Sequence, residues 1–151
     1  MVAMRSVRLF EIDDCSIEAV MRAKGTSTVS LCIPCRDEAA TIGSLVSIIR
    51  AELMRKVPFV DELIVVDDRS TDDTAAVASS AGAKVVSIND VHAKYGEGHG
   101  KGNVLWSSLA ASTGDFVVWI DGDITSFEPH WITRLLAPML DDESVALVKA
   151  V

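Results

Sequence analysis

Asp121 and Asp123, separated only by Gly122, directly follow the apolar run at residues 116–120. In extended backbone, residues two apart share a face, so both carboxylates point the same way, and the glycine lets a ligand approach the backbone closely. Carboxylate oxygens suit Mg²⁺ or Mn²⁺, which bind through carboxylates together with ligand phosphates. We therefore predict that Asp123 holds a divalent cation that bridges a diphosphate and stabilises its charge. The alternative is a turn with solvated aspartates, which the apolar run disfavours because strand ends are preferred ligand sites.

Residues 96–102, with the sequence GEGHGKG, are the second candidate for ligand binding. Glycines allow backbone amides to reach a phosphate, and a helix that follows offers its positive N-terminal end. Lys101 adds a full positive charge. The segment is not a Walker A loop, because Gly102 stands where that motif has Ser or Thr, and it does not have the spacing of a dinucleotide-binding fold. The pattern indicates a phosphate contact that includes Lys101; the alternative is a mobile solvent loop.

Two further aspartates, Asp67 and Asp68, close another apolar run. At a strand end, one of them is placed to accept hydrogen bonds from a ribose or a base. We expect Asp72 and Asp73 to serve instead in helix capping and in the helix dipole. We expect Arg36 and Arg69 to balance the negative charge of these carboxylates.

The cysteines and histidines show weaker patterns. The chain has three cysteines, an odd number, which argues against a disulfide framework. Cys32 and Cys35 form a C-x-x-C, but Cys32 lies in an apolar run and no second pair completes a zinc tetrahedron. We therefore expect two structural thiols. His92 and His130 show no interpretable spacing, and we expect both on the surface, whereas His99 lies in the glycine segment.

The elements that would position these residues are short apolar runs that alternate with helical patterns. The runs predict strands at residues 29–33, 63–67, 84–88 and 116–121, and a further apolar run covers residues 145–151. Helices are predicted at residues 42–53, from a capping box of Ser70 and Asp73 to Gly82, at residues 101–112 and 131–140, and in a short segment that Asp14 caps and Gly25 closes. Residues 89–100 are expected to form one long connection.

This order of elements predicts an α/β domain with a mainly parallel sheet flanked by helices. The predicted strands have no polar alternation, which is typical of strands covered on both faces. In such sheets, ligands bind beyond the carboxyl ends of the strands. Residues 34–38, 67–69 and 121–123 all follow strands, so carboxylates gather at one edge of the sheet, and we predict the functional site there.

Composition and charge limit the classes of partner. The chain has 151 residues, 49% of them hydrophobic, and a formal net charge of −8. An acidic surface repels nucleic acid and anionic lipid, so we expect neither as a partner. No apolar run approaches the roughly 20 residues that a membrane span needs. No apolar stretch at the N-terminus resembles a signal peptide, and a cytoplasmic location is therefore expected.

Several motifs together resemble the GT-A glycosyltransferases, which have a Rossmann-like fold. These are Ile33-Pro34 followed by Asp37-Glu38 and Thr41-Ile42, the stretch VVDDRSTDDT at residues 65–74, and the later D-x-D. Within that fold, the chain is similar to the glucosyl-3-phosphoglycerate synthases. The similarity is carried by GKGNVLWSSLAASTGDFVVWIDGD at residues 100–123 and by residues 127–140, and it extends over nearly the whole chain from about residue 16.

The resemblance implies transfer of glucose from UDP-glucose to 3-phosphoglycerate with retention of configuration, with Mg²⁺ or Mn²⁺, in a cytoplasmic homodimer. The implied donor-site residues are Pro34, Cys35, Arg36, Asp37 and Glu38 around the uridine, Asp68 at a position that is usually a serine contacting the nucleotide, Lys101 at the UDP moiety, Asp121 and Gly122 at the nucleotide sugar, and Asp123 at the metal. No catalytic residue is assigned.

The chain departs from the family pattern in two respects. Asp68 makes the second motif resemble inverting GT-A enzymes, such as polyprenol-phosphate sugar synthases. Family members are also much longer, and their acceptor-binding segment corresponds to nothing before Val151. We therefore expect a leader with a short helix at residues 1–28 and an incomplete, C-terminally truncated nucleotide-sugar-binding GT-A subdomain at residues 29–151.

Such a donor-binding part is expected to transfer poorly on its own, because positioning both substrates supplies much of a transferase's rate. The alternatives are an inverting sugar transferase and a truncated, non-catalytic nucleotide-sugar-binding remnant. A nucleotidyltransferase is disfavoured, because residues 34–38 are not the glycine-rich signature that usually follows its first strand.

Overall fold

The computed structural model describes residues 7–11 and 16–150. Its centre is an all-parallel sheet with the strand order β3-β2-β1-β4. The strands are β1 (Val29–Cys35), β2 (Glu62–Asp67), β3 (Lys84–Ser87) and β4 (Phe116–Trp119). The two central strands are buried almost throughout, as their continuous apolar runs predict. The α/β fold with a parallel sheet is therefore confirmed.

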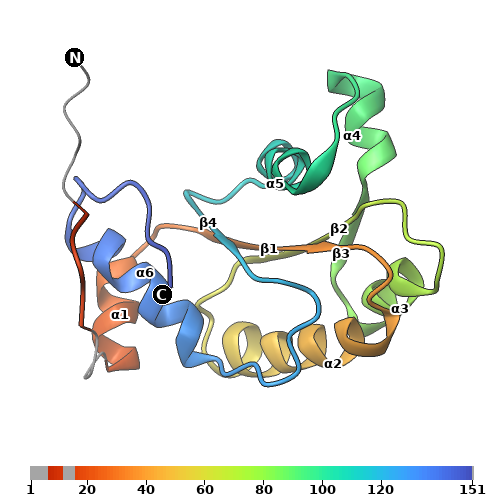
Figure 1. Ribbon diagram of the computed structural model, residues 1–151. Helices are drawn as coiled ribbons and strands as arrows, with labels where there is room; N and C mark the ends of the chain where they lie inside the picture. Colours follow the sequence, from red (N-terminus) through yellow and green to blue (C-terminus); the bar gives the residue numbers. More distant parts are fainter. Residues whose placement is uncertain (1–6, 12–15, 151) are drawn as a thin grey trace, which may run out of the picture.

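Helices cover both faces of this sheet (Figure 1). The helices are α1 (Ile17–Lys24), α2 (Ala39–Ile49), which continues as the π-helical segment η1 (Arg50–Lys56), α3 (Thr74–Ala81), α4 (Ile88–Tyr95), α5 (Gly100–Ala111) and α6 (His130–Asp141). Figure 1 shows α4 and α5 on one face, and α1, α2, α3 and α6 on the other. The larger core cluster includes Ile33, Val65 and Ile42 on the α2 face, and the smaller one joins Cys32 and Val104 on the α5 face.

The predicted helix boundaries are partly right. Gly82 ends α3 in the left-handed conformation at φ 100°, as expected. The capping box of Ser70 and Asp73 is wrong, because the Asp72 carboxylate accepts the hydrogen bond from the Thr74 amide (2.9 Å) instead. Gly25 ends α1 as predicted. The side chain that caps α1 is Ser16, and Asp14 lies outside the described residues.

Two segments differ from the sequence-based expectation. Residues 88–95 form helix α4 rather than part of a long connection, because the Ser87 hydroxyl caps it and Val91 packs inward. This helix also buries His92, which was expected on the surface; the His92 Nε2 lies 2.8 Å from Asn103 Nδ2. Residues 145–150 form no strand, because no described strand pairs with them. His130 is exposed, as expected.

In the part of the chain that the structure describes, no helix combines the length and the apolar character that crossing a membrane requires.

The amino-terminal edge of the sheet is held together by the Glu62 carboxylate. It accepts hydrogen bonds from the Ser30 hydroxyl (2.7 Å) and the Thr113 amide (3.0 Å), and it pairs with the Lys84 ammonium at 2.9 Å. Burial alone would raise the pKa of Glu62, but the hydrogen bonds from Lys84, Ser30 and Thr113 together lower it. One side chain thus links β1, β2, β3 and the loop before β4.

We expect Glu62→Gln to lower the free energy of unfolding by about 1–2 kcal/mol at neutral pH, because hydrogen bonds to a charged group are lost. The lowered pKa means that the ionised form stabilises the fold above the unfolded-state value of about 4.3 and that this contribution disappears as the pH falls through the folded-state value. The difference between wild type and variant should therefore shrink on acidification. Urea unfolding between pH 7 and pH 3 measures it, with exposed Glu143→Gln as the control; a difference independent of pH would contradict the prediction.

Candidate functional site

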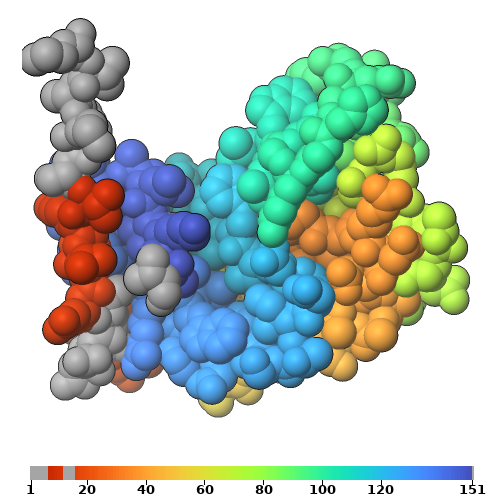
Figure 2. Space-filling view, viewed as in Figure 1, coloured from red at the N-terminus to blue at the C-terminus, as the bar shows by residue number. Residues whose placement is uncertain are grey.

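The carboxyl ends of the strands meet around a cavity of about 670 Å³. The strand register brings them together, because Cys35 at the end of β1 pairs with Asp67 at the end of β2, and Cys32 pairs with Trp119 at the end of β4. All of the donor-site residues expected from the sequence except Asp37 line this cavity: Pro34, Cys35, Arg36, Glu38, Asp68, Lys101, Asp121, Gly122 and Asp123. Figure 2 shows their segments meeting on one face, coloured orange, yellow-green, teal and light blue.

Asp37 differs from the expectation, since it does not line the cavity. Its carboxylate accepts a hydrogen bond from the Thr71 amide (2.6 Å), and its own amide donates to the Ser70 hydroxyl (3.0 Å). Asp37 adopts the left-handed conformation at φ 57°, which is uncommon for a residue other than glycine. Its side chain therefore ties the loop after β1 to the loop after β2.

The same two loops are joined at the start of α2. The Asp72 carboxylate accepts from the Ala39 amide at 3.1 Å and also contacts the Thr74 hydroxyl, and the Thr74 hydroxyl accepts from the Glu38 amide at 2.8 Å. The hydrogen bond from the Thr74 hydroxyl, followed by those from backbone amides, lowers the pKa of Asp72, which stays ionised at neutral pH. The capping role expected for Asp72 is thus confirmed, and it serves two helices.

The acidic triplet lies where β4 leaves the sheet. The Ile120 amide still donates to the Cys32 carbonyl at 3.3 Å. Two residues further along β1, on the same side of the strand, stands Pro34, which has no N–H to continue the pairing. The chain therefore turns at Gly122, whose carbonyl accepts a hydrogen bond from the Thr41 hydroxyl at 2.7 Å. A Cβ at Gly122 would lie 2.6 Å from the Cys35 sulfur, so only glycine fits this approach.

Lys101 faces the triplet from the first turn of α5. Its ammonium pairs with the Asp121 carboxylate at 2.7 Å, and this hydrogen bond, with the negative charge of Asp121, raises the pKa of Lys101. Both side chains are well exposed, at 67% and 57%. An exposed pair of this kind is weak, about 0–1 kcal/mol, so either partner can exchange it for a ligand. Lys101 is thus an available cation beside the carboxylates.

The start of α5 adds a second feature that attracts anions. Gly100 opens the helix at φ 81°, and the N-cap residue His99 makes no side-chain capping bond. The first amides of α5 are therefore open to a ligand, and the helix dipole favours a negative one. His99, Gly100 and Val104 line the cavity. The glycine-rich pattern predicts this helix end, but no sequence signal identifies Val104 as a lining residue.

Negative charge gathers on the opposite wall. Burial, together with the nearby carboxylates of Glu38, Asp67 and Asp123, raises the pKa of the Cys35 thiol to about 12. One oxygen of Asp67 is buried without a hydrogen-bond partner among the described residues. A divalent cation would offset this field, so the residues fit Mg²⁺ or Mn²⁺. No group of three metal-ligating side chains occurs in the described ranges, and such an ion would complete its shell with phosphate oxygens and water.

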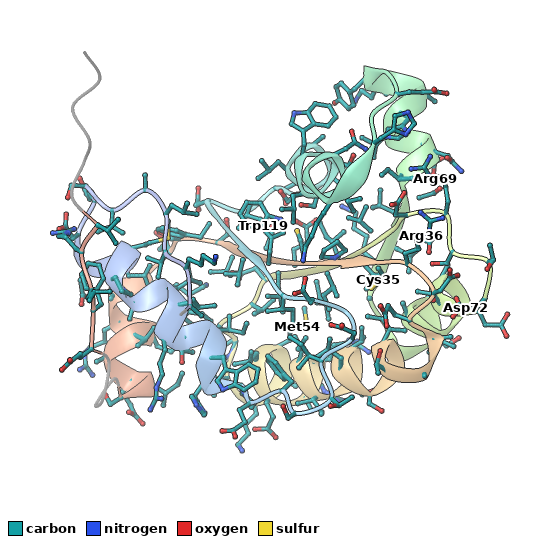
Figure 3. The ribbon with its side chains drawn as sticks, in the orientation of Figure 1. Cys35, Arg36, Met54, Arg69, Asp72 and Trp119 are labelled. Carbon is teal, nitrogen blue, oxygen red and sulfur yellow. The ribbon has the colours of Figure 1, made fainter. Side chains whose placement is uncertain are left out.

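The remaining wall is formed by Asp68 and two arginines. Arg69 donates from Nε and Nη2 to one oxygen of Asp68 at 3.0 and 2.9 Å, which confirms that Arg69 balances a carboxylate. Arg69 also adopts a left-handed conformation, at φ 58°. Arg36 makes no ion pair with the described carboxylates, so the expected charge balance is wrong for Arg36, and it lines the cavity. Figure 3 shows Arg36 and Arg69 on the α4 side and Cys35 on the α2 side.

The C-x-x-C is not a joint site. Cys32 belongs to the core cluster on the α5 face and Cys35 to the cluster on the α2 face, because strand residues three apart point to opposite faces. Burial raises the pKa of Cys32 to about 11 and that of Cys35 to about 12. Both thiols are free, buried and protonated at neutral pH, as expected for structural cysteines.

We expect both thiols to react with iodoacetamide at pH 8 at least about a hundredfold more slowly in the folded protein than in urea, because only the thiolate attacks. A Cys15→Ser background isolates Cys32 and Cys35, and mass spectrometry of peptides after timed quenching gives the rate of each. Equal rates in the folded and unfolded protein would contradict the assignment.

Comparison with known proteins identifies the family. The model described as "Glycosyl transferase family 2" matches residues 30–151. The glucosyl-3-phosphoglycerate synthase of Mycolicibacterium smegmatis is 44% identical over 127 residues, which are 84% of this chain and 41% of that protein. The structure of the Mycobacterium tuberculosis synthase with Mn²⁺, UDP and glucosyl-3-phosphoglycerate superimposes with a TM-score of 0.80 at 38% identity, covering 91% of this chain and 48% of that one.

A mannosyl-3-phosphoglycerate synthase from Rubrobacter xylanophilus also matches, with a TM-score of 0.76 and 39% identity over 82% of this chain and 41% of that one. The chain spans about two-fifths of the length of the curated relatives it matches. These structural matches confirm the GT-A fold that the motifs imply. Since the family model covers all but the first residues of the chain, the protein belongs to glycosyl transferase family 2.

Proposed function

We propose that this chain binds a UDP-sugar, UDP-glucose in the first place, together with Mg²⁺ or Mn²⁺, as the donor-binding part of a glucosyl-3-phosphoglycerate synthase. The observation that carries the proposal is the cavity edge on which Lys101, the open start of α5 and the acidic triplet face one another. It combines an anion site with a cation site, and a diphosphate with a divalent metal presents the matching charges.

Each wall of the cavity has a proposed part in donor binding. Asp123 holds the metal, which when bound stabilises negative charge on the diphosphate as the sugar departs. Lys101 exchanges Asp121 for a phosphate oxygen, and the first amides of α5 orient the diphosphate. Pro34, Cys35, Arg36 and Glu38 enclose the uridine, with Asp68 beside the nucleotide and Gly122 beneath the sugar. Asp37 contributes through the loops that it joins.

The acceptor, the stereochemical outcome, the cellular location and the oligomeric state are proposals as well. Structures of the relatives hold Mn²⁺ with UDP-glucose and phosphoglyceric acid, or Mg²⁺ with UDP, which supports 3-phosphoglycerate as the acceptor. Retention of configuration, which the resemblance implies, stays a prediction. The buried free thiols fit the reducing conditions of the cytoplasm. The homodimer implied by the resemblance stays a prediction.

A mannose nucleotide is the second candidate donor, because one related structure is that of a mannosyl-3-phosphoglycerate synthase. Competition between UDP-glucose and a mannose nucleotide for the cavity separates the two.

Isothermal titration of the 151-residue protein with UDP tests the proposal. We expect the affinity to rise about tenfold or more when Mn²⁺ replaces EDTA, because the ion links the diphosphate to Asp123. Asp123→Asn should abolish the effect of Mn²⁺, whereas Asp141→Asn at the end of α6, outside the cavity, should leave it unchanged. Binding that is equally strong with Mn²⁺ and EDTA would contradict the metal site, and no binding of UDP by the folded protein would contradict the proposal as a whole.

The part of Lys101 is tested separately. Lys101→Ala should weaken UDP binding about tenfold, because a charge-assisted hydrogen bond to phosphate is lost and Asp121 is left unpaired beside the diphosphate. Binding of uridine, which has no phosphate, should not change. Lys101→Arg retains the charge, and exposed Lys149→Ala is the control. An equal loss for UDP and uridine by competition NMR would place Lys101 at the nucleoside instead.

A further inference from the structure

Gly122 is held from two sides by residues of a different part of the chain. The Thr41 hydroxyl, in the first turn of α2, donates to its carbonyl at 2.7 Å. On the other side, the Cys35 sulfur lies 2.6 Å from the position that a Cβ at Gly122 would occupy. Gly122 itself is buried, while Asp121 and Asp123 on either side of it are exposed. The direction of both carboxylates therefore depends on how the glycine between them is fixed.

Thr41 supplies the hydrogen bond that fixes it. The peptide of Gly122 lies past the last strand pairing of β4, since Pro34 cannot continue the ladder. Its carbonyl has no other donor among the described residues, so the turn depends on this one hydroxyl. Thr41 does not line the cavity and cannot reach a ligand there. The same hydroxyl also lies 3.3 Å from the Glu38 carbonyl, but its bond to the Gly122 carbonyl is the shorter of the two.

The start of α2, where Thr41 lies, is held in place by hydrogen bonds to another loop. The start of α2 is bound to the loop after β2 through Asp72 at the Ala39 amide (3.1 Å) and through Thr74 at the Glu38 amide (2.8 Å). Thr41 thus connects the triplet after β4 to the pair of loops after β1 and β2. The Thr41 hydroxyl therefore links the proposed uridine wall to the turn that carries Asp123, the proposed metal ligand.

We propose that Thr41 is the positioning residue of the acidic triplet, and that its hydroxyl sets how strongly metal binding and diphosphate binding reinforce each other. This inference rests on the proposed donor site. Outer groups that orient a metal ligand typically change metal affinity about 10–100-fold when they are removed. Loss of the Thr41 hydroxyl should therefore weaken the coupling between metal binding and diphosphate binding, and not the affinity for the nucleotide in the absence of metal.

The test compares Thr41→Val, which keeps the shape and removes the hydroxyl, with Thr41→Ser, which keeps the hydroxyl. We expect Thr41→Val to reduce the Mn²⁺-dependent gain in UDP affinity about tenfold or more, with UDP affinity in EDTA unchanged, and Thr41→Ser to retain the gain. Ser47→Ala is the matched control. The Ser47 hydroxyl, like that of Thr41, lies on α2 and donates to a backbone carbonyl (Gly43, 2.8 Å), but it does not contact the triplet. A retained gain in Thr41→Val, or an equal loss in EDTA, would overturn the inference.

A ligand-free measurement separates this inference from the proposed function. Hydrogen exchange followed by mass spectrometry should show faster exchange at residues 120–125 in Thr41→Val than in wild type or Thr41→Ser, without metal or UDP. Unchanged exchange there would overturn the positioning role. If wild type shows no metal-dependent UDP binding, the proposed function fails, while the exchange result still decides whether Thr41 holds the turn.

A second perturbation leaves Thr41 intact. Gly122→Ala should reduce the coupling, because the new methyl collides with the Cys35 sulfur, and adding Cys35→Ala should restore it. If the double variant is no better than Gly122→Ala, the position of Gly122 does not control the coupling. This pair also keeps the inference testable should Thr41→Val fail to fold.

Discussion

The parallel pairing of β1 with both β2 and β4 is the constraint on which the rest of the structure depends. β1 is buried on both faces, and its register with its neighbours fixes where their carboxyl ends stand. Pro34 then ends the pairing with β4 just before the acidic triplet. A single strand therefore brings together the loop at residues 34–38, the Asp67-Asp68 pair and the triplet. The cavity follows from that arrangement.

The site has opposite charges on opposite walls. Lys101 and the open start of α5 favour an anion, while the carboxylates around Cys35 favour a cation. In the free protein these charges meet in one exposed ion pair, between Lys101 and Asp121. A diphosphate with its metal satisfies both walls at once. The hydrogen bonds of Asp37 and Asp72 hold the loops behind the walls in place, so the walls are pre-organised.

Much of this arrangement could be predicted from the sequence, because the apolar runs and the rule that ligands bind at strand ends are local signals. What could not be predicted depends on contacts between distant segments. Ser70 and Asp73 have capping spacing, yet Ser70 accepts from Asp37, and Asp72 caps the helix. Asp37 belongs to the predicted donor-site segment, yet it bonds to Thr71 and does not line the cavity. In helix α4 the buried residues Ile88, Val91 and His92 do have helical spacing, but the helix is only eight residues long, too short for this pattern to identify it.

In the proposed donor site, a metal on Asp123 and a diphosphate near Lys101 share the carboxyl edge of this sheet. Anomalous diffraction from crystals grown with Mn²⁺ and UDP tests it most directly, because the manganese signal locates the ion without assumptions. We expect one manganese peak at direct coordination distance from the Asp123 carboxylate, with diphosphate oxygens beside it and Lys101 turned from Asp121 to the phosphate. A manganese peak elsewhere, or UDP bound away from the strand ends, would contradict it.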